Sequence, residues 1–208
     1  MTVVKPRRRE MSAALTRVAL LDAAKTLFVT KGFDETSIED IAQLAQASKG
    51  AVYHHFSDKR EIFAEVFRSS QAVVIQAAID SMSGSGQSWD LVEAATKAFL
   101  RSYVADEDAR ALLRQVMGVL GWDRVRALDE EVALPFLRST IEESVRTGQV
   151  RPTPIEATAE LLFSLFCNAV LFVAGVPDAA RASSDVEAVI LFILAGLKPT
   201  QPPTPRRP

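Results

Sequence analysis

Residues 36–59 read TSIEDIAQLAQASKGAVYHHFSDK, and this stretch decides how the N-terminal part of the chain folds. It opens on two helix start signals, because Thr36 with Glu39, and Ser37 with Asp40, have the three-residue spacing of an N-cap and its partner. Apolar residues then recur at i, i+3, i+4 and i+7, the spacing of one buried helix face, at Ile38, Ile41, Ala42 and Ala45. A short helix is therefore expected over residues 36–45.

A second short helix is expected over residues 48–56, after a break at residues 46–48. At about 100° per residue, Val52 and Phe56 lie on its buried side, whereas His54 points almost directly away from that side. Two short helices joined by a three-residue turn are typical of a helix-turn-helix, whose second helix reads DNA in the major groove. Capped helix pairs are also common in all-helical proteins without this role, so the exposed face of the second helix has to support the interpretation.

That exposed face has the residue types that contact with DNA requires. Gly50 and Ala51 are small, so the backbone can approach the base edges closely, and the methyl group of Ala51 can meet a thymine methyl. Tyr53 and His55 fall on opposite flanks, from which polar side chains can reach phosphates. Each feature alone is also typical of an ordinary solvent-exposed helix. Their joint placement on one face favours a reading helix.

The two histidines of the chain, His54 and His55, are adjacent, which raises the possibility of a metal site. Adjacent residues of a helix diverge by about 100°, whereas chelation from one helix needs partners at i, i+3 or i, i+4. The sequence also lacks an HExxH motif, a nucleophile elbow and a glycine-rich phosphate loop, and its single cysteine, Cys167, lies in an apolar stretch typical of a core. We therefore expect no metal, no cofactor and no enzymatic activity.

The rest of the chain has helical signals without a convincing strand, so the sequence predicts an all-α fold of about nine helices. Residues 83–88, SGSGQS, are expected to form a flexible joint, and the proline-rich tail is too poor in apolar residues to fold. Leu134-Pro135 is expected to kink the longest helix. The remaining helices are expected at residues 12–31, 57–82, 89–104, 106–120, 122–147, 154–174 and 184–197.

Residues 12–68 resemble the DNA-binding domain of the TetR (TetR/AcrR) family of transcriptional regulators. The resemblance is carried by LLDAAKTLFVTKGFDETS followed by IEDIAQLAQASKGAVYHHFSDKREIF. It implies a homodimer whose two reading helices enter successive major grooves of a pseudo-palindromic double-stranded DNA operator. Arg7, Arg8 and Arg9 lie where some family members carry a basic extension. The DNA contacts implied by position are Ser37, Ser48, Lys49, Gly50, Ala51, Tyr53, His54, His55 and Lys59.

The same resemblance implies that the later helices bind an effector and form the dimer interface. The last helix has a continuous apolar stripe, and the one before it is apolar on almost every side, so both must be buried against something. An ordinary monomer core is the alternative to a dimer. The candidate dimer residues are Leu161, Leu165, Phe172, Val186, Val189, Ile190, Ile193 and Leu197.

A pocket for the effector is expected between the helices that follow the joint. Its aromatic and aliphatic candidates suggest a mostly apolar small molecule, and Arg110, Arg114 or Asn168 can supply polar contacts. Each candidate is also typical of plain core. The candidate lining residues are Trp89, Phe99, Tyr103, Met117, Trp122, Phe136, Phe163 and Cys167.

The predicted function is a ligand-responsive DNA-binding repressor, and the alternative is a helical ligand carrier or adaptor that binds no operator. The N-terminus lacks the apolar core of a secretory signal, and the apolar stretch at residues 161–176 is shorter than the roughly 20 residues of a membrane span, so a cytoplasmic protein without a membrane partner is expected. The expected segments are a basic flexible arm (1–11), a helix-turn-helix domain (12–57), a connecting helix (58–82), an effector-binding and dimerisation domain (83–198) and a disordered tail (199–208).

Overall fold

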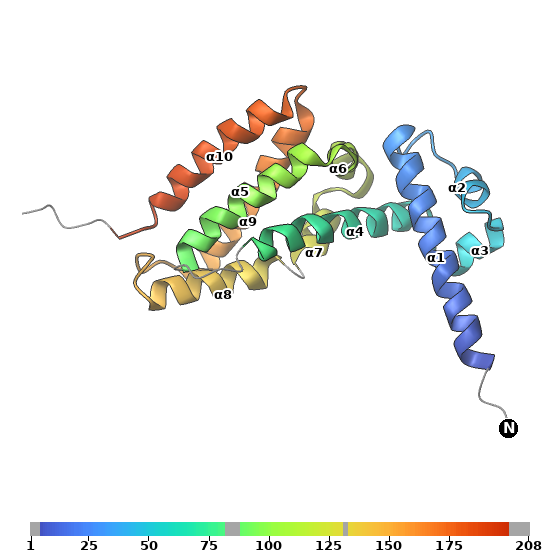
Figure 1. Cartoon of the computed structure of the whole chain (residues 1–208), viewed down its shortest axis with the longest axis horizontal. Helices are drawn as coiled ribbons and strands as arrows, with labels where there is room; N and C mark the ends of the chain where they lie inside the picture. Colours follow the sequence, from blue (N-terminus) through green and yellow to red (C-terminus); the bar gives the residue numbers. More distant parts are fainter. Residues whose placement is uncertain (1–4, 82–87, 131–132, 200–208) are drawn as a thin grey trace, which may run out of the picture. The chain divides into compact units, whose positions relative to one another are not determined.

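The computed structural model describes residues 5–81, 88–130 and 133–199, and these ranges contain ten α-helices and no strand (Figure 1). The predicted all-α class is therefore confirmed. The expected flexible joint lies almost wholly outside the described residues, as does the expected tail. The helices are α1 (Lys5–Thr30), α2 (Ile38–Leu44), α3 (Lys49–His55), α4 (Lys59–Asp80), α5 (Ser88–Ala105), α6 (Glu107–Leu120), α7 (Trp122–Glu130), α8 (Ala133–Arg146), α9 (Ile155–Gly175) and α10 (Ala179–Ala195).

Two helix starts differ from the sequence-based expectation. Helix α1 begins at Lys5 rather than near residue 12, because Pro6 is tolerated in a first turn and the arginines that follow are good helix formers. The segment expected as one helix over residues 122–147 is helical in α7 and α8, and the two residues between them lie outside the described residues. Pro135 lies within α8, and the kink expected there stays a prediction. Helix α10 begins at Ala179, because the side chain of Asp178 caps it by accepting a hydrogen bond from the Arg181 N–H at 3.0 Å.

The chain divides into two compact units, and the division passes through helices rather than between them. The first unit comprises residues up to Ala72 together with Ala111–Val125, and the second comprises Val73–Arg110 and the residues from Arg126 onward. Helices α4, α6 and α7 therefore each contribute to both units. The domain limits proposed from the sequence remain predictions.

The core of the first unit holds the short helices α2 and α3 against α1, as Figure 1 shows. One apolar face of α1 is buried, with Leu20, Ala24 and Phe28 inaccessible to solvent. Phe28 also meets Phe63 of α4 edge to face, with ring centroids 5.2 Å apart, and Phe33 packs against both rings. This aromatic cluster fixes the loop between α1 and α2 and thereby the position of the helix pair that follows it.

In the second unit α8 packs on α9, and α5 packs on α10. The C-terminal end of α10 is held by donors from other helices and loops, because the Trp89 indole N–H donates to the Leu194 carbonyl at 3.3 Å and the Arg151 N–H donates to the Leu197 carbonyl at 2.9 Å. Lys198 adds an ion pair with Glu93 at 2.7 Å. The hydrogen bonds from Trp89 and Arg151 satisfy carbonyls that the end of a helix otherwise leaves unpaired.

Two helices, α4 and α9, are long and apolar enough to cross a membrane when judged by length and composition alone. Helix α9 has 21 residues and is longer than the apolar stretch considered in the sequence. Seven of its residues are buried within the fold, including Phe163, Val170 and Val173. A core helix of a soluble protein meets the same length and composition limits, so neither helix by itself indicates a membrane.

Candidate nucleic-acid interface

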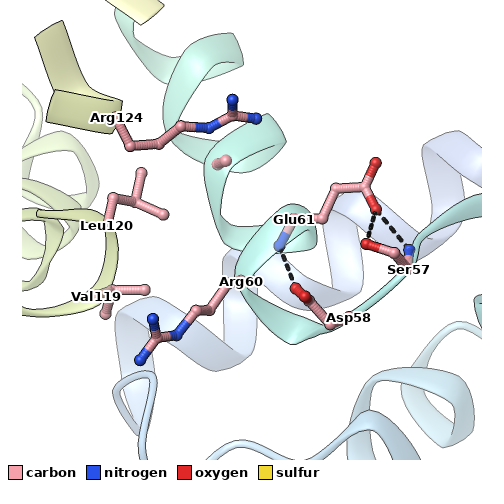
Figure 2. Close-up of a pocket in the computed structure, with 8 residues that line it drawn as sticks. Ser57, Asp58, Arg60, Glu61, Val119, Leu120 and Arg124 are labelled. Carbon is pink, nitrogen blue, oxygen red and sulfur yellow. Dashed lines mark hydrogen bonds between the residues drawn. The ribbon is translucent and has the colours of Figure 1, made fainter. Parts of the chain in front are cut away.

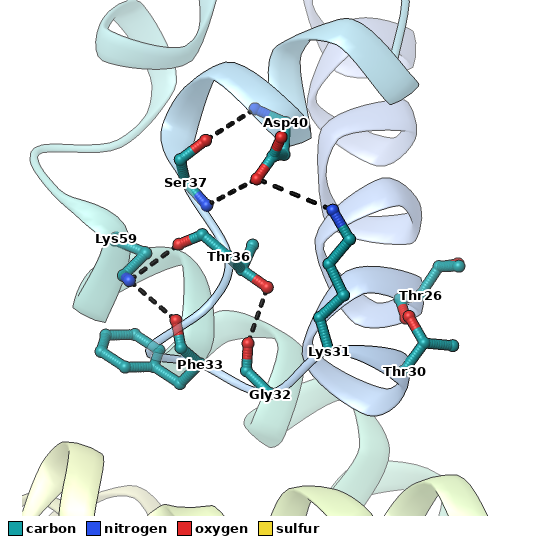
Figure 3. Close-up of polar contacts among 9 residues, drawn as sticks. All are labelled: Thr26, Thr30, Lys31, Gly32, Phe33, Thr36, Ser37, Asp40 and Lys59. Atoms are coloured by element: carbon teal, nitrogen blue, oxygen red, sulfur yellow. Dashed lines mark hydrogen bonds and ion pairs between the residues drawn. The ribbon is translucent and has the colours of Figure 1, made fainter.

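Helix α2 begins with a reciprocal cap, as the sequence predicts for Ser37 and Asp40. The Asp40 N–H donates to Ser37 Oγ at 3.0 Å, and the Ser37 N–H donates to Asp40 Oδ2 at 3.1 Å (Figure 3). The hydrogen bond from the Ser37 backbone is the main cause that lowers the pKa of Asp40. The parallel interpretation of Thr36 and Glu39 as a cap pair is wrong. Thr36 is buried, and its hydroxyl donates to the Gly32 carbonyl at 2.7 Å.

The turn between α2 and α3 depends on one residue in the left-handed region. Gln46 has φ of +52°, which reverses the chain after the last turn of α2 and lets the Ala47 N–H donate to the Ala42 carbonyl at 2.9 Å. Ser48 then caps α3, since its Oγ accepts the Ala51 N–H at 3.1 Å. The helix-turn-helix predicted from the sequence is therefore present, with α3 as its second helix.

The faces of α3 agree with the angular argument made from the sequence. Val52 and Phe56 are buried, whereas Tyr53, with 52% of its surface exposed, and His54 face solvent. A Cβ added to Gly50 would meet only Ser48 Oγ, at 3.7 Å, so no internal contact requires glycine there. The exposed side of α3 thus presents polar tips and a bare stretch of backbone.

Lys59 occupies a different position from the one a simple phosphate contact implies. Its ammonium donates to the Phe33 carbonyl at 2.7 Å and to the Thr36 carbonyl at 2.8 Å, and it lies 4.2 Å from the centroid of the Phe33 ring (Figure 3). Two of its three donors therefore hold the loop that precedes α2. The first role of Lys59 is to position the helix pair, and a contact with DNA through its third donor stays a prediction.

Lys49 also has partners within the protein. Its ammonium forms an ion pair with Glu39 of α2, and it lies 5.9 Å from the centroid of the Tyr53 ring. The hydrogen bond between the two side chains lowers the pKa of Glu39 and raises the pKa of Lys49. All three side chains lie on the solvent-exposed surface of the helix pair.

The two histidines contact each other, although the sequence interpretation treats them as independent. Their rings meet edge to face with centroids 5.2 Å apart. Partial burial lowers the pKa of His55, and the charges of His54 and Arg17 lower it further. No group of three or more His, Cys, Asp or Glu within the described ranges could hold a metal ion.

The residues predicted to line an effector pocket are divided between the two units. Met117 and Trp122 belong to the first unit, whereas the other six belong to the second. Trp89, Tyr103 and Phe163 are buried, and the Trp89 indole is bonded to α10 as described above. Sequence reasoning missed Phe166, whose ring lies 6.0 Å from that of Phe99. Phe136 and Cys167 are half-buried.

The suggested polar contact from Arg110 is already used inside the fold. Its guanidinium donates to the carbonyls of Tyr103 and Val104, the latter at 2.6 Å, and forms an ion pair with Glu107 at 3.1 Å. Arg110 therefore caps the C-terminal end of α5. Of the other two suggestions, Asn168 donates to the Ser164 carbonyl at 2.8 Å.

The predicted dimer residues divide into exposed and buried sets. Ile190 is buried, and Leu165, Val186 and Leu197 are half-buried. The other four are exposed, and Phe192, which the sequence reasoning did not single out, is the most exposed of the large apolar residues of α10, at 80%. The exposed apolar residues of α9 and α10 are Leu161, Phe172, Val189, Phe192 and Ile193.

One pocket, with a volume of about 390 Å³, lies wholly within the first unit (Figure 2). None of the predicted pocket residues lines it. Its carboxylates serve the start of α4, because Glu61 accepts the Ser57 hydroxyl at 2.6 Å and Asp58 accepts the Glu61 N–H at 2.8 Å. The lining residues are Ser57, Asp58, Arg60, Glu61, Ala64, Val119, Leu120 and Arg124.

The comparisons with known families agree with this helix-turn-helix and extend beyond it. Residues 20–66 match the family described as "Bacterial regulatory proteins, tetR family", and residues 89–197 match "Tetracyclin repressor-like, C-terminal domain". The chain belongs to the TetR family of transcriptional regulators. TetR-family regulators are soluble and not enzymes, so in this one α4 and α9 are core helices.

Relatives of this TetR-family regulator match it either along most of the chain or in the DNA-binding part. The transposon Tn10 TetC protein of Escherichia coli is 23% identical over 184 residues, covering 88% of this chain and 92% of that protein. The HTH-type transcriptional regulator AcrR of Shigella flexneri is 38% identical over 66 residues, which is 32% of this chain and 31% of AcrR. A crystal structure of a TetR-family regulator from Pectobacterium atrosepticum has a TM-score of 0.78 and 23% identity, and covers 92% of this chain and 98% of that one.

Proposed function

We propose that this TetR-family regulator is a cytoplasmic repressor that binds a pseudo-palindromic operator as a homodimer and is released by a small, mostly apolar effector. The observation that carries the proposal is the exposed face of α3. Its backbone is uncovered at Gly50, its polar tips at Tyr53 and His54 point to solvent, and its buried face is packed on the rest of the first unit. A helix that is packed on one face and exposed on the other can enter the major groove with its exposed face against the bases.

The roles on this surface follow from chemistry and position. Ser37 and Ser48 hold the first turns of α2 and α3, so their hydroxyls and the neighbouring amides are placed to meet phosphates. Gly50 and Ala51 would lie against base edges, and His54 would read a base by hydrogen bonding. Tyr53 and the remaining residues of the predicted set would fix the register of the helix on the DNA backbone.

A homodimer is supported by the apolar residues that α9 and α10 leave in solvent. Leu161, Phe172, Val189 and Phe192 are each more than half exposed. A soluble protein seldom leaves so many large apolar side chains on one helix pair unless another surface covers them. Because most homodimers have two-fold symmetry, the same pair of helices from a second copy is the expected partner, and it would place two α3 helices on two half-sites.

An apolar effector is supported by the aromatic residues within the second unit. The ring of Phe99 meets the rings of Tyr103 and Phe166 edge to face, at 5.3 and 6.0 Å. A solved relative in fold, RolR in complex with the ligand resorcinol, has a TM-score of 0.68 and 16% identity and shows one small aromatic ligand held by a similar fold. Effector binding would favour a conformer whose reading helices are wrongly spaced for the operator, so DNA affinity would fall while the dimer persists.

The test is to recover genomic DNA fragments with the purified protein and to measure binding to the enriched palindrome by fluorescence anisotropy. We expect tight binding with two chains per palindrome, a steep decrease with rising salt and a strong preference over a scrambled duplex. Light scattering on the free protein should give twice the mass of one chain. Binding that ignores both salt and sequence would instead support a ligand carrier that binds no operator.

A further inference from the structure

An acidic side chain shares the DNA-facing surface with the reading helix. Glu39 projects from the first turn of α2 to the ammonium of Lys49, the first residue of α3, and Lys49 in turn lies over the ring of Tyr53. The three residues form an exposed row that spans both helices of the helix-turn-helix. The carboxylate of Glu39 is not used as a cap, since Asp40 performs that task and Thr36 bonds elsewhere.

Neither stability nor simple DNA affinity accounts for this carboxylate. An ion pair between two exposed side chains contributes little to folding stability, because solvent and salt screen it. A carboxylate on a surface that approaches a polyanion is repelled, and pairing with Lys49 also removes a cation that phosphates would attract. The arrangement therefore weakens sequence-independent attraction to DNA, which is a recognised way to gain specificity.

We propose that Glu39 is a specificity-determining positioning residue, which holds the Lys49 ammonium over Tyr53 and keeps it from pairing with phosphates of non-operator DNA. The inference rests on the DNA binding of the proposed function. On non-operator DNA the pair stays closed and α3 gains no phosphate contact from Lys49. On the operator the base contacts of α3 fix its register on the duplex, so a released Lys49 ammonium has fewer phosphates within reach there than on random DNA.

The experiment compares Glu39→Gln with the wild type on a random-sequence 30-base-pair duplex, measured by anisotropy across a salt series. We expect Glu39→Gln to bind the random duplex about threefold to tenfold more tightly at low salt, and the slope of log K against log salt to steepen by about 0.9, the value of one added phosphate contact. On the enriched palindrome the gain should be smaller, so the ratio of operator to random affinity falls.

Two further variants show whether Glu39 acts through Lys49. In a Lys49→Met background, Glu39→Gln should leave the salt slope unchanged and give a clearly smaller gain in affinity, because only the repulsion of the carboxylate is relieved and no cation is released. Glu35→Gln removes the same charge just before α2, and within the described ranges Glu35 has no ion pair. It should therefore leave the salt slope unchanged.

The possible outcomes separate this inference from the proposed function. A wild type that binds no duplex in a salt-dependent way would contradict the DNA-binding function itself. If the wild type binds normally but Glu39→Gln gives the same slope, or shows the same gain with Met at position 49, the positioning role of Glu39 is wrong and DNA binding stands.

Discussion

The reading head is defined as α2 and α3 with their caps. It differs from the effector region of the second unit in how far apart in the sequence the contacting residues lie. The reading head is built from about twenty consecutive residues whose caps and periodicity act over one or two turns. The effector region depends on α5, α8, α9 and α10, which pack across long sequence separations. Trp89 and the Leu194 carbonyl to which it is bonded are 105 residues apart. Local signals determine the first region, whereas only packing determines the second.

Trp89 is expected to give the largest effect on the free energy of unfolding. It was predicted to line a pocket, and its side chain is buried in the core of the second unit. Replacing it by alanine would leave a cavity and remove the bond to the Leu194 carbonyl, so the free energy of unfolding should fall by about 3–5 kcal/mol. Urea unfolding followed by circular dichroism measures it. Trp122→Ala, at a half-buried position, is the matched control and should cost clearly less. Equal losses would contradict the core assignment of Trp89.

Lys59 is expected to give the second largest effect on the free energy of unfolding. It tests the reading head as Trp89 tests the second unit. Lys59→Met keeps most of the side-chain stem but leaves the Phe33 and Thr36 carbonyls without their charged donor, so we expect a loss of about 1.5–3 kcal/mol in the free energy of unfolding. Arg60→Met, which alters the adjacent exposed cation, should leave stability unchanged. If Lys59→Met unfolds like the wild type and only DNA binding weakens, Lys59 serves the phosphates alone.

The reading head shows how far sequence can predict and where it stops. The capping box at Ser37 and the buried Val52 follow from local spacing, and both are present. The bonds of Lys59 could not be predicted, because its acceptor at Phe33 lies 26 residues earlier, in a loop whose path is set by tertiary packing. The pairing of Glu39 with Lys49 likewise depends on the angle between two helices, which no periodicity specifies.

The second unit follows the same rule with less local information. The existence of the helices was predictable from apolar periodicity, whereas the start of α10 was not, because the cap provided by Asp178 was not recognised. Which aromatic rings meet was also beyond the sequence. Phe99 contacts Phe166, a residue absent from the predicted set, since the contact requires the packing of α5 on α9.

A substitution at Gly50 is expected to have a smaller effect. It should change folding stability and operator affinity in opposite directions. Gly50→Ala should raise the free energy of unfolding by about 0.5–1 kcal/mol, because alanine is the better helix former and its Cβ meets only Ser48 Oγ at 3.7 Å. Operator affinity should fall, since the added methyl lies between the α3 backbone and the bases. Gly118→Ala, on α6 with nothing within 4 Å of the added Cβ, should give the same stabilisation without loss of affinity. Unchanged operator affinity for Gly50→Ala would show that the backbone does not approach the bases closely.

His55 gives the smallest expected effect, through the dependence of stability on pH. Its pKa in the folded protein is lowered, chiefly by burial, so below a pH of about 6.5 the unfolded chain binds a proton that the folded chain resists. Stability from this group is therefore fully present above that pH and is lost as the pH falls toward the lowered pKa. Urea midpoints for wild type and His55→Gln at about pH 7.5 and pH 5 measure it, and the wild type should lose more stability on acidification than the variant does. An equal loss in both proteins would mean that acid sensitivity lies elsewhere, whereas a smaller loss in the wild type would reverse the sign and show that the fold stabilises a protonated His55.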